Sequence, residues 1–129
     1  MAANIAKYRK ADHSCASTIL ASSVEYMGLD QSYTDVAASY GGGIGKGDLC
    51  GFLTGAIMAL GLYSGMVKDG RKDIQTYSKT LSNEFWTWWE TMSPLHCADM
   101  KPNYNTKGFN RMIQRVAVKV EELIDRKKT

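Results

Sequence analysis

The segment that most restricts the fold is a run of glycines that leads into a helical pattern. Residues 41–47 read Gly-Gly-Gly-Ile-Gly-Lys-Gly, and Asp48 and Leu49 then precede Cys50. Glycine adopts backbone conformations that other residues avoid, so this run predicts a tight loop. Asp48 is a good N-cap residue, and an apolar helical period begins at Leu49. We therefore expect a loop that ends at a helix N terminus, with Cys50 in the first helical turn.

The expected position of Cys50 favours reactivity. Backbone N–H groups in the first turn of a helix have no partner within the helix, and the helix dipole favours negative charge there. A cysteine at such a position tends to be a thiolate, which is the form that binds metal or reacts. The sequence therefore indicates Cys50 as the centre of this chain's chemistry.

Apolar residues recur at helical spacing along most of the chain, and no convincing strand alternation appears. The pattern predicts long helices over residues 5–27, 49–63, 72–92 and 108–127, and a short helix that Asp30 caps and that runs to Tyr40. At 129 residues the chain is long enough for one buried core. We expect a single all-α domain over residues 1–129, a bundle of four long helices plus one short helix.

The glycine loop and the helix over residues 49–63 also share a row of small residues. Gly47, Gly51, Gly55 and Ala59 recur every four residues, beside the apolar stripe of the same helix. Such an edge lets another backbone or a bulky group come close, and we expect it to leave room for a cofactor beside Gly51 and Gly55.

Composition excludes several classes of function. The net charge is +3, and the basic residues are spread out, without the stripe and interleaved aromatics of a nucleic-acid-binding protein. Residues 49–67 form the longest apolar stretch, but glycines interrupt it, so membrane insertion is not expected. The first residues lack a secretory pattern, which predicts a cytoplasmic protein. Three widely spaced cysteines are not a disulfide scaffold; in a reducing compartment they fill cores, bind metal or react.

The glycine run is not a nucleotide-binding loop. A Walker A loop needs Gly-x-x-x-x-Gly-Lys followed by Ser or Thr, and here Tyr40 holds the first glycine position and Gly47 the hydroxyl position. The Rossmann spacing is also absent. The chain has no zinc or di-iron motif and no paired carboxylates on one face. The residues alone therefore do not indicate turnover of a substrate.

Residues 41–62 closely resemble the signature region of a redox-active protein family, C_GCAxxG_C_C, which is named for a Cys-Gly-Ala-x-x-Gly motif. The motif reads Cys-Gly-Phe-Leu-Thr-Gly over residues 50–55, with Phe52 in the alanine position. Cys15 fits the family's early helical cysteine, and Cys97 matches the cysteine that follows the aromatic fourth helix. The family pattern has a fourth cysteine, which would fall near residues 109–112, where this chain has neither cysteine nor histidine.

Relatives of this family include the iron–sulfur part of split-Soret cytochromes, so the resemblance implies an iron–sulfur cluster or a redox thiol centre. By the same analogy we expect [2Fe-2S] rather than a larger cluster, in an electron-transfer or redox-binding protein rather than an enzyme with its own substrate. It implies Cys15, Cys50 and Cys97 as the cluster ligands. The fourth ligand stays open between His96, His13, an oxygen ligand, a partner's residue and none; each histidine on its own is read as hydrogen-bonded or exposed. Backbone N–H groups of the glycine loop are expected to wrap the centre and bond its sulfurs. The cofactor-binding glycines would be Gly42, Gly43, Gly45, Gly51 and Gly55.

Two other functions remain open at this point. One is a cluster-free thiol protein in which Cys50 forms a reversible disulfide with Cys15 or Cys97. The other is a structural subunit that has lost the site. We also expect a homodimer or a redox partner protein to bind through the aromatic residues in and just beyond the helix over residues 72–92, because one amphipathic stripe cannot bury them all. These residues are Tyr77, Phe85, Trp86, Trp88, Trp89 and Tyr104.

Overall fold

A computed structural model describes residues 1, 4–41, 43–93 and 106–128, with the side chains of the last helix described over 111–125. It contains the helices α1 (Ile5–Lys10), α2 (Cys15–Met27), α3 (Gly51–Val67), α4 (Arg71–Glu90) and α6 (Thr106–Lys128). Two short helical segments, η2 (Gln31–Ala37) and η3 (Gly43–Gly47), lie between α2 and α3. No strand occurs in these ranges, and the predicted all-α bundle is confirmed.

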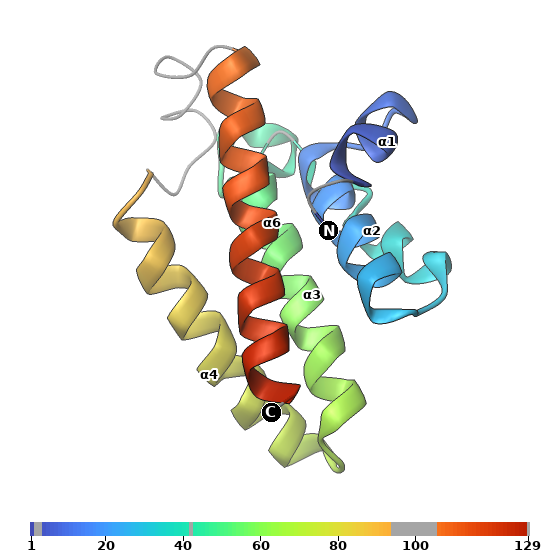
Figure 1. The fold of residues 1–129 in the computed structure, drawn as a ribbon, viewed down its shortest axis with the longest axis vertical. Coiled ribbons are helices and arrows are strands. Elements are labelled where there is room, and N and C mark those ends of the chain that lie inside the picture. Colours follow the sequence, from blue (N-terminus) through green and yellow to red (C-terminus); the bar gives the residue numbers. More distant parts are fainter. Residues whose placement is uncertain (2–3, 42, 94–105, 129) are drawn as a thin grey trace.

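Helix α3 is the central element of the bundle. It contacts α2 on one side and α4 and α6 on the other (Figure 1). The apolar stripe predicted from the sequence forms its buried surface, with Leu53, Ala56 and Leu60 fully buried. The facing helices bury side chains at the same helical spacing, which closes the core. They are Leu81, Phe85 and Trp89 of α4, and Met112, Ile113, Val116, Ala117, Val120, Leu123 and Ile124 of α6.

The first long helix is not continuous, so the prediction of one helix over residues 5–27 is wrong. Helix α1 ends at Lys10, Asp12 has a left-handed backbone with φ 65°, and α2 begins at Cys15. The Oγ of Ser14 accepts a hydrogen bond from the Ser17 N–H at 3.3 Å, which makes Ser14 the N-cap of α2. A serine that caps the following turn starts a new helix, and this separates α1 from α2.

The other element boundaries differ less from the prediction. The short helix after Asp30 is a 3₁₀ helix over Gln31–Ala37, and the Asp30 side chain caps it as expected. Helix α3 continues to Val67, four residues past the predicted end. Helix α3 begins at Gly51, so Cys50 is its N-cap residue and does not lie within the first turn. No helix of the described ranges is both long and apolar enough to cross a membrane.

A hydrogen bond between α2 and α6 gives a prediction for alkaline pH. The Tyr26 hydroxyl donates to Asp125 Oδ1 at 2.5 Å, and this bond raises the pKa of Tyr26 to about 12. Since the pKa in the folded protein exceeds the ordinary value, the bond stabilises fully below pH 10 and is lost as the pH rises through 12. We expect Tyr26→Phe to lower the free energy of unfolding by about 1 kcal/mol at pH 8. Urea unfolding of both proteins across this pH range should show the difference disappearing at the alkaline end; a constant difference would contradict the assignment.

Candidate redox site

The N-terminal ends of α2 and α3 lie directly against each other. A Cβ atom placed on Gly51 would lie 2.9 Å from the Cys15 Cβ and 2.9 Å from the Ala16 nitrogen. A Cβ atom on Gly55 would lie 2.4 Å from the Ala16 carbonyl oxygen. Such distances are shorter than real carbon contacts, so only glycine permits this approach. The residue next to Cys50 therefore contacts Cys15, and two of the three predicted ligands belong to one region.

This contact corrects one expectation. The small-residue edge was expected to leave room for a cofactor beside Gly51 and Gly55, but the backbone of Ala16 fills that space. The physical reason is that two helices can pack with their backbones this close only where one of them lacks side chains. The alternative expected from the sequence, close approach of another backbone, is what the structure shows.

The glycine loop packs beside Cys15 at its start and leads to Cys50 at its end. A Cβ atom on Gly41 would lie 2.4 Å from the Ser14 Cβ, so the start of the loop packs on the N-cap of the Cys15 helix. Gly43 has φ 66° and packs against the Asp48 backbone, whose N–H donates to the Gly43 carbonyl at 2.9 Å. Gly45, with φ 68°, is exposed at the tip of the loop. The tight loop predicted from the glycines is confirmed at these positions; Gly42 lies outside the described residues.

Cys50 is the buried cysteine of the pair. Its relative exposure is 3%, and its carbonyl oxygen accepts hydrogen bonds from the N–H groups of Leu53 and Thr54, both at 3.0 Å. Asp48, which the sequence predicted as the cap of this helix, instead accepts a hydrogen bond from the Leu49 N–H at 2.9 Å. Cys50 is therefore the N-cap residue of α3, where its carbonyl group accepts the first hydrogen bonds of the helix, at the end where the dipole favours negative charge.

Cys15 is half-exposed and is the first residue of α2. The Nη1 of Arg9 donates to the Cys15 Sγ at 3.8 Å, and the same nitrogen donates to the His13 carbonyl at 3.3 Å. Sequence reasoning missed Arg9, because residues six apart on a continuous helix lie on different faces. The break after α1 brings Arg9 back over the start of α2. The Ser14 capping pattern was the available signal.

The remaining candidate ligands are described only in part. Cys97 and His96 lie outside the described residues. His13 Nδ1 lies 3.1 Å from the Ser17 Oγ, and its ring packs edge-on against Tyr8, so the reading of His13 as a hydrogen-bonded residue is confirmed. Within the described ranges, no three cysteine, histidine or acidic side chains form a metal-binding group.

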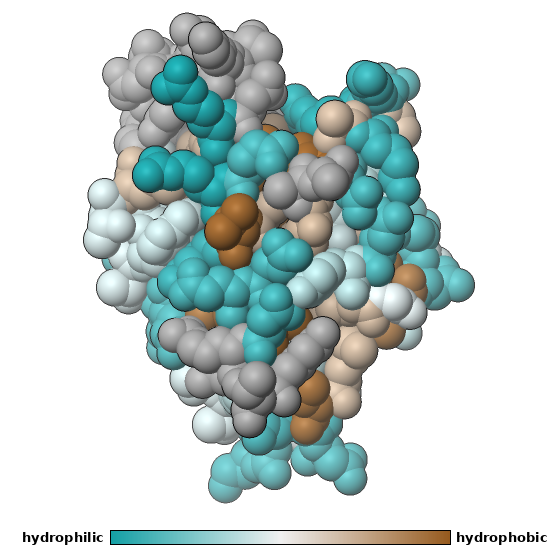
Figure 2. Space-filling model, in the orientation of Figure 1, coloured by the Kyte–Doolittle hydropathy of each residue, from teal (hydrophilic) through white to brown (hydrophobic). Residues whose placement is uncertain are grey.

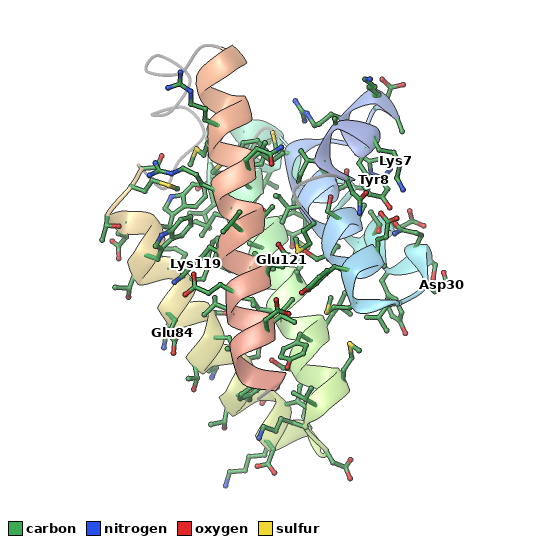
Figure 3. The ribbon with its side chains drawn as sticks, viewed as in Figure 1. Lys7, Tyr8, Asp30, Glu84, Lys119 and Glu121 are labelled. Carbon is green, nitrogen blue, oxygen red and sulfur yellow. The ribbon has the colours of Figure 1, made fainter. Side chains whose placement is uncertain are left out.

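The aromatic residues of α4 divide into buried and partly exposed members. Phe85 and Trp89 are fully buried, whereas Tyr77, Trp86 and Trp88 are half-buried. The Trp88 ring centroid lies 6.0 Å from the Nζ of Lys119, a residue of α6 that is labelled in Figure 3. On the face drawn in Figure 2, hydrophobic residues form small separate patches among hydrophilic ones. Tyr104 is outside the described residues, and the homodimer or redox partner at these aromatics stays a prediction.

The family model described as "Putative redox-active protein (C_GCAxxG_C_C)" matches residues 13–123. The chain belongs to this family. The match covers Cys15, Cys50 and Cys97, and it begins after α1 has ended. No curated protein and no solved structure matches the chain. Family membership therefore supports a redox role, and the resemblance inferred from the sequence is confirmed.

Proposed function

We propose that this chain is a small electron-transfer protein whose centre forms where the N termini of α2 and α3 meet. In this proposal Cys15 and Cys50 ligate an iron–sulfur cluster, [2Fe-2S], and Cys97 supplies the third ligand. One observation carries the proposal: Gly51, the neighbour of Cys50, packs on the Cys15 side chain.

The chemistry of the described residues fits such a cluster. Cysteine sulfurs are the usual protein ligands of iron–sulfur clusters, and a cluster held by thiolates carries negative charge. Cys15 is the first residue of α2 and Cys50 is the N-cap of α3, and helix N termini favour negative charge. The guanidinium of Arg9 adds a full positive charge beside Cys15. Helix dipoles and Arg9 thus offset the charge that the sulfurs would bring.

The two cysteines would have different roles in the proposed centre. Cys50 is buried at the base of the site, where the protein excludes water from its sulfur. Cys15 is half-exposed, so its sulfur is the one that a partner can approach. A bound cluster would supply one-electron chemistry. Because Cys15 is more exposed than Cys50, electrons would pass between the centre and a partner protein on the Cys15 side.

The same adjacency favours a second candidate, a cluster-free thiol centre. Cys15 and Cys50 would form a reversible disulfide when both thiols give up a proton and the pair gives up two electrons. A disulfide of a partner protein would accept these electrons and protons and become two thiols. This reaction needs only the two described cysteines.

Anaerobic purification followed by a visible spectrum and an iron and sulfide assay tests the proposal. We expect broad visible absorption with iron and sulfide in equal amounts, since the cluster is built from both. If the protein is colourless and loses two thiols on mild oxidation, the result would favour the Cys15–Cys50 disulfide over the cluster. A colourless protein with inert thiols would contradict any redox function and leave a structural subunit.

A further inference from the structure

Helix α1 is held in place on α2 by a cluster of polar contacts. The Tyr8 hydroxyl donates to Glu25 Oε2 at 2.7 Å, and the Lys7 Nζ lies 3.1 Å from Glu25 Oε1 (Figure 3). Gln31 Nε2 donates to the Tyr8 oxygen at 3.2 Å, and the Ile5 side chain is buried below. Six residues are too few for a stable isolated helix, so these contacts are what fix α1.

Arg9 directly follows the anchored Tyr8. Its Nη1 makes two contacts, one with the Cys15 sulfur and one with the His13 carbonyl in the turn that joins α1 to α2. The carbonyl contact restrains the guanidinium over the start of α2, on the half-exposed side of the site. Helix α1 lies before residues 13–123, which the family model matches, so the match itself assigns no role to Arg9.

We propose that Arg9 is a positioning residue of the redox centre, which holds a permanent positive charge at the Cys15 sulfur and thereby favours the reduced form. This inference rests on the proposed function. One electron from a reduced carrier protein adds negative charge to a cluster. When a dithiol reduces a Cys15–Cys50 disulfide it hands over two electrons and two protons, and negative charge arises at Cys15 when its thiol ionises to the thiolate. A cation near the sulfur stabilises the more negative form, and charge and hydrogen bonds at sulfur set the reduction potential.

The test compares Arg9→Gln with Lys10→Gln in the full chain. Lys10 is an exposed neighbour on the same helix, so its replacement removes the same charge without the contact to Cys15. In a redox titration, we expect Arg9→Gln to shift the ratio of reduced to oxidised centre about threefold toward the oxidised form. Lys10→Gln should change it much less, Arg9→Lys should restore part of the shift, and raised salt should shrink it. Equal shifts for the two glutamine variants would overturn the proposal.

A second measurement separates failure of this inference from failure of the proposed function. It compares the rates at which anionic iodoacetate and neutral iodoacetamide alkylate Cys15 in the metal-free, reduced protein. The ratio of the two rates can be measured whether or not the protein has a redox couple. Arg9 attracts the anionic reagent, so Arg9→Gln should lower this ratio about threefold, and Lys10→Gln should leave it nearly unchanged. If the parent protein shows no redox couple but the alkylation ratio falls in Arg9→Gln, the proposed function is wrong, whereas the effect of the Arg9 charge on the Cys15 sulfur is confirmed. An unchanged ratio in Arg9→Gln would show that Arg9 does not act on this sulfur.

Discussion

Cys50→Ser is expected to lose nearly all of the bound iron and sulfide, together with any reversible thiol oxidation. A serine hydroxyl has the size of the thiol but rarely ionises, so it is a poor ligand and cannot form a disulfide. The helix should survive the change, because the Cys50 carbonyl oxygen still accepts from Leu53 and Thr54. Serine is also a favoured N-cap residue. Iron, sulfide and thiol assays, with far-UV circular dichroism, check both parts.

The matched variants are Cys15→Ser and Cys97→Ser. Cys15 is half-exposed, so water or another side chain can reach the vacated position, and we expect a weakened, oxygen-sensitive site to remain. Full iron content and spectrum in Cys50→Ser, with loss in either of the others, would show that Cys50 is not the principal ligand. If all three variants behave like the parent protein in every assay, the cysteines do not form a redox centre.

Gly55→Ala is expected to destabilise the protein by about 2–3 kcal/mol, the cost of forcing extra atoms into a well-packed contact. The added methyl carbon would stand 2.4 Å from the Ala16 carbonyl oxygen, and a backbone atom cannot rotate away as a flexible side chain can. Helices α2 and α3 must therefore move apart. Urea unfolding measures the loss of stability directly.

Helix α3 supplies the control in Gly65→Ala. Gly65 is exposed and has nothing within 4 Å of an added Cβ atom. Alanine is the better helix former, so this variant should gain up to about 1 kcal/mol. A lower free energy of unfolding in Gly55→Ala, together with a higher one in Gly65→Ala, would show that Gly55 is required for the helix contact. Equal stability of Gly55→Ala and the parent would contradict the close approach of α2 and α3.

The helices could be predicted from the sequence because each buries one side at a regular spacing. Leu53, Leu60 and Phe85 recur where a helical period places them, and all three are buried. The break between α1 and α2 escaped this reasoning. Ile5 and Tyr8 continue the apolar period of the following helix, so only the capping role of Ser14 distinguishes two helices from one.

The sequence indicated Cys15 and Cys50 as candidate site residues, but it did not predict what surrounds them. The row of Gly51 and Gly55 indicated that something comes close to α3, but whether a cofactor or a backbone does so depends on tertiary packing. The contact between Arg9 and Cys15 depends on the turn at Asp12. The Ser14 cap indicates a break between the helices, but it does not predict the left-handed backbone of Asp12.

The claim that Cys15 and Cys50 form one centre is tested most directly by disulfide mapping of the metal-free protein. Mild oxidation, unfolding in acid with alkylation of the remaining thiols, and mass spectrometry of the peptides would identify which cysteines have joined. The structure predicts a peptide pair linked through Cys15 and Cys50 within one chain, because Gly51 packs on the Cys15 side chain. Recovery of Cys50 as an alkylated thiol while Cys15 is oxidised with another group would contradict a shared centre.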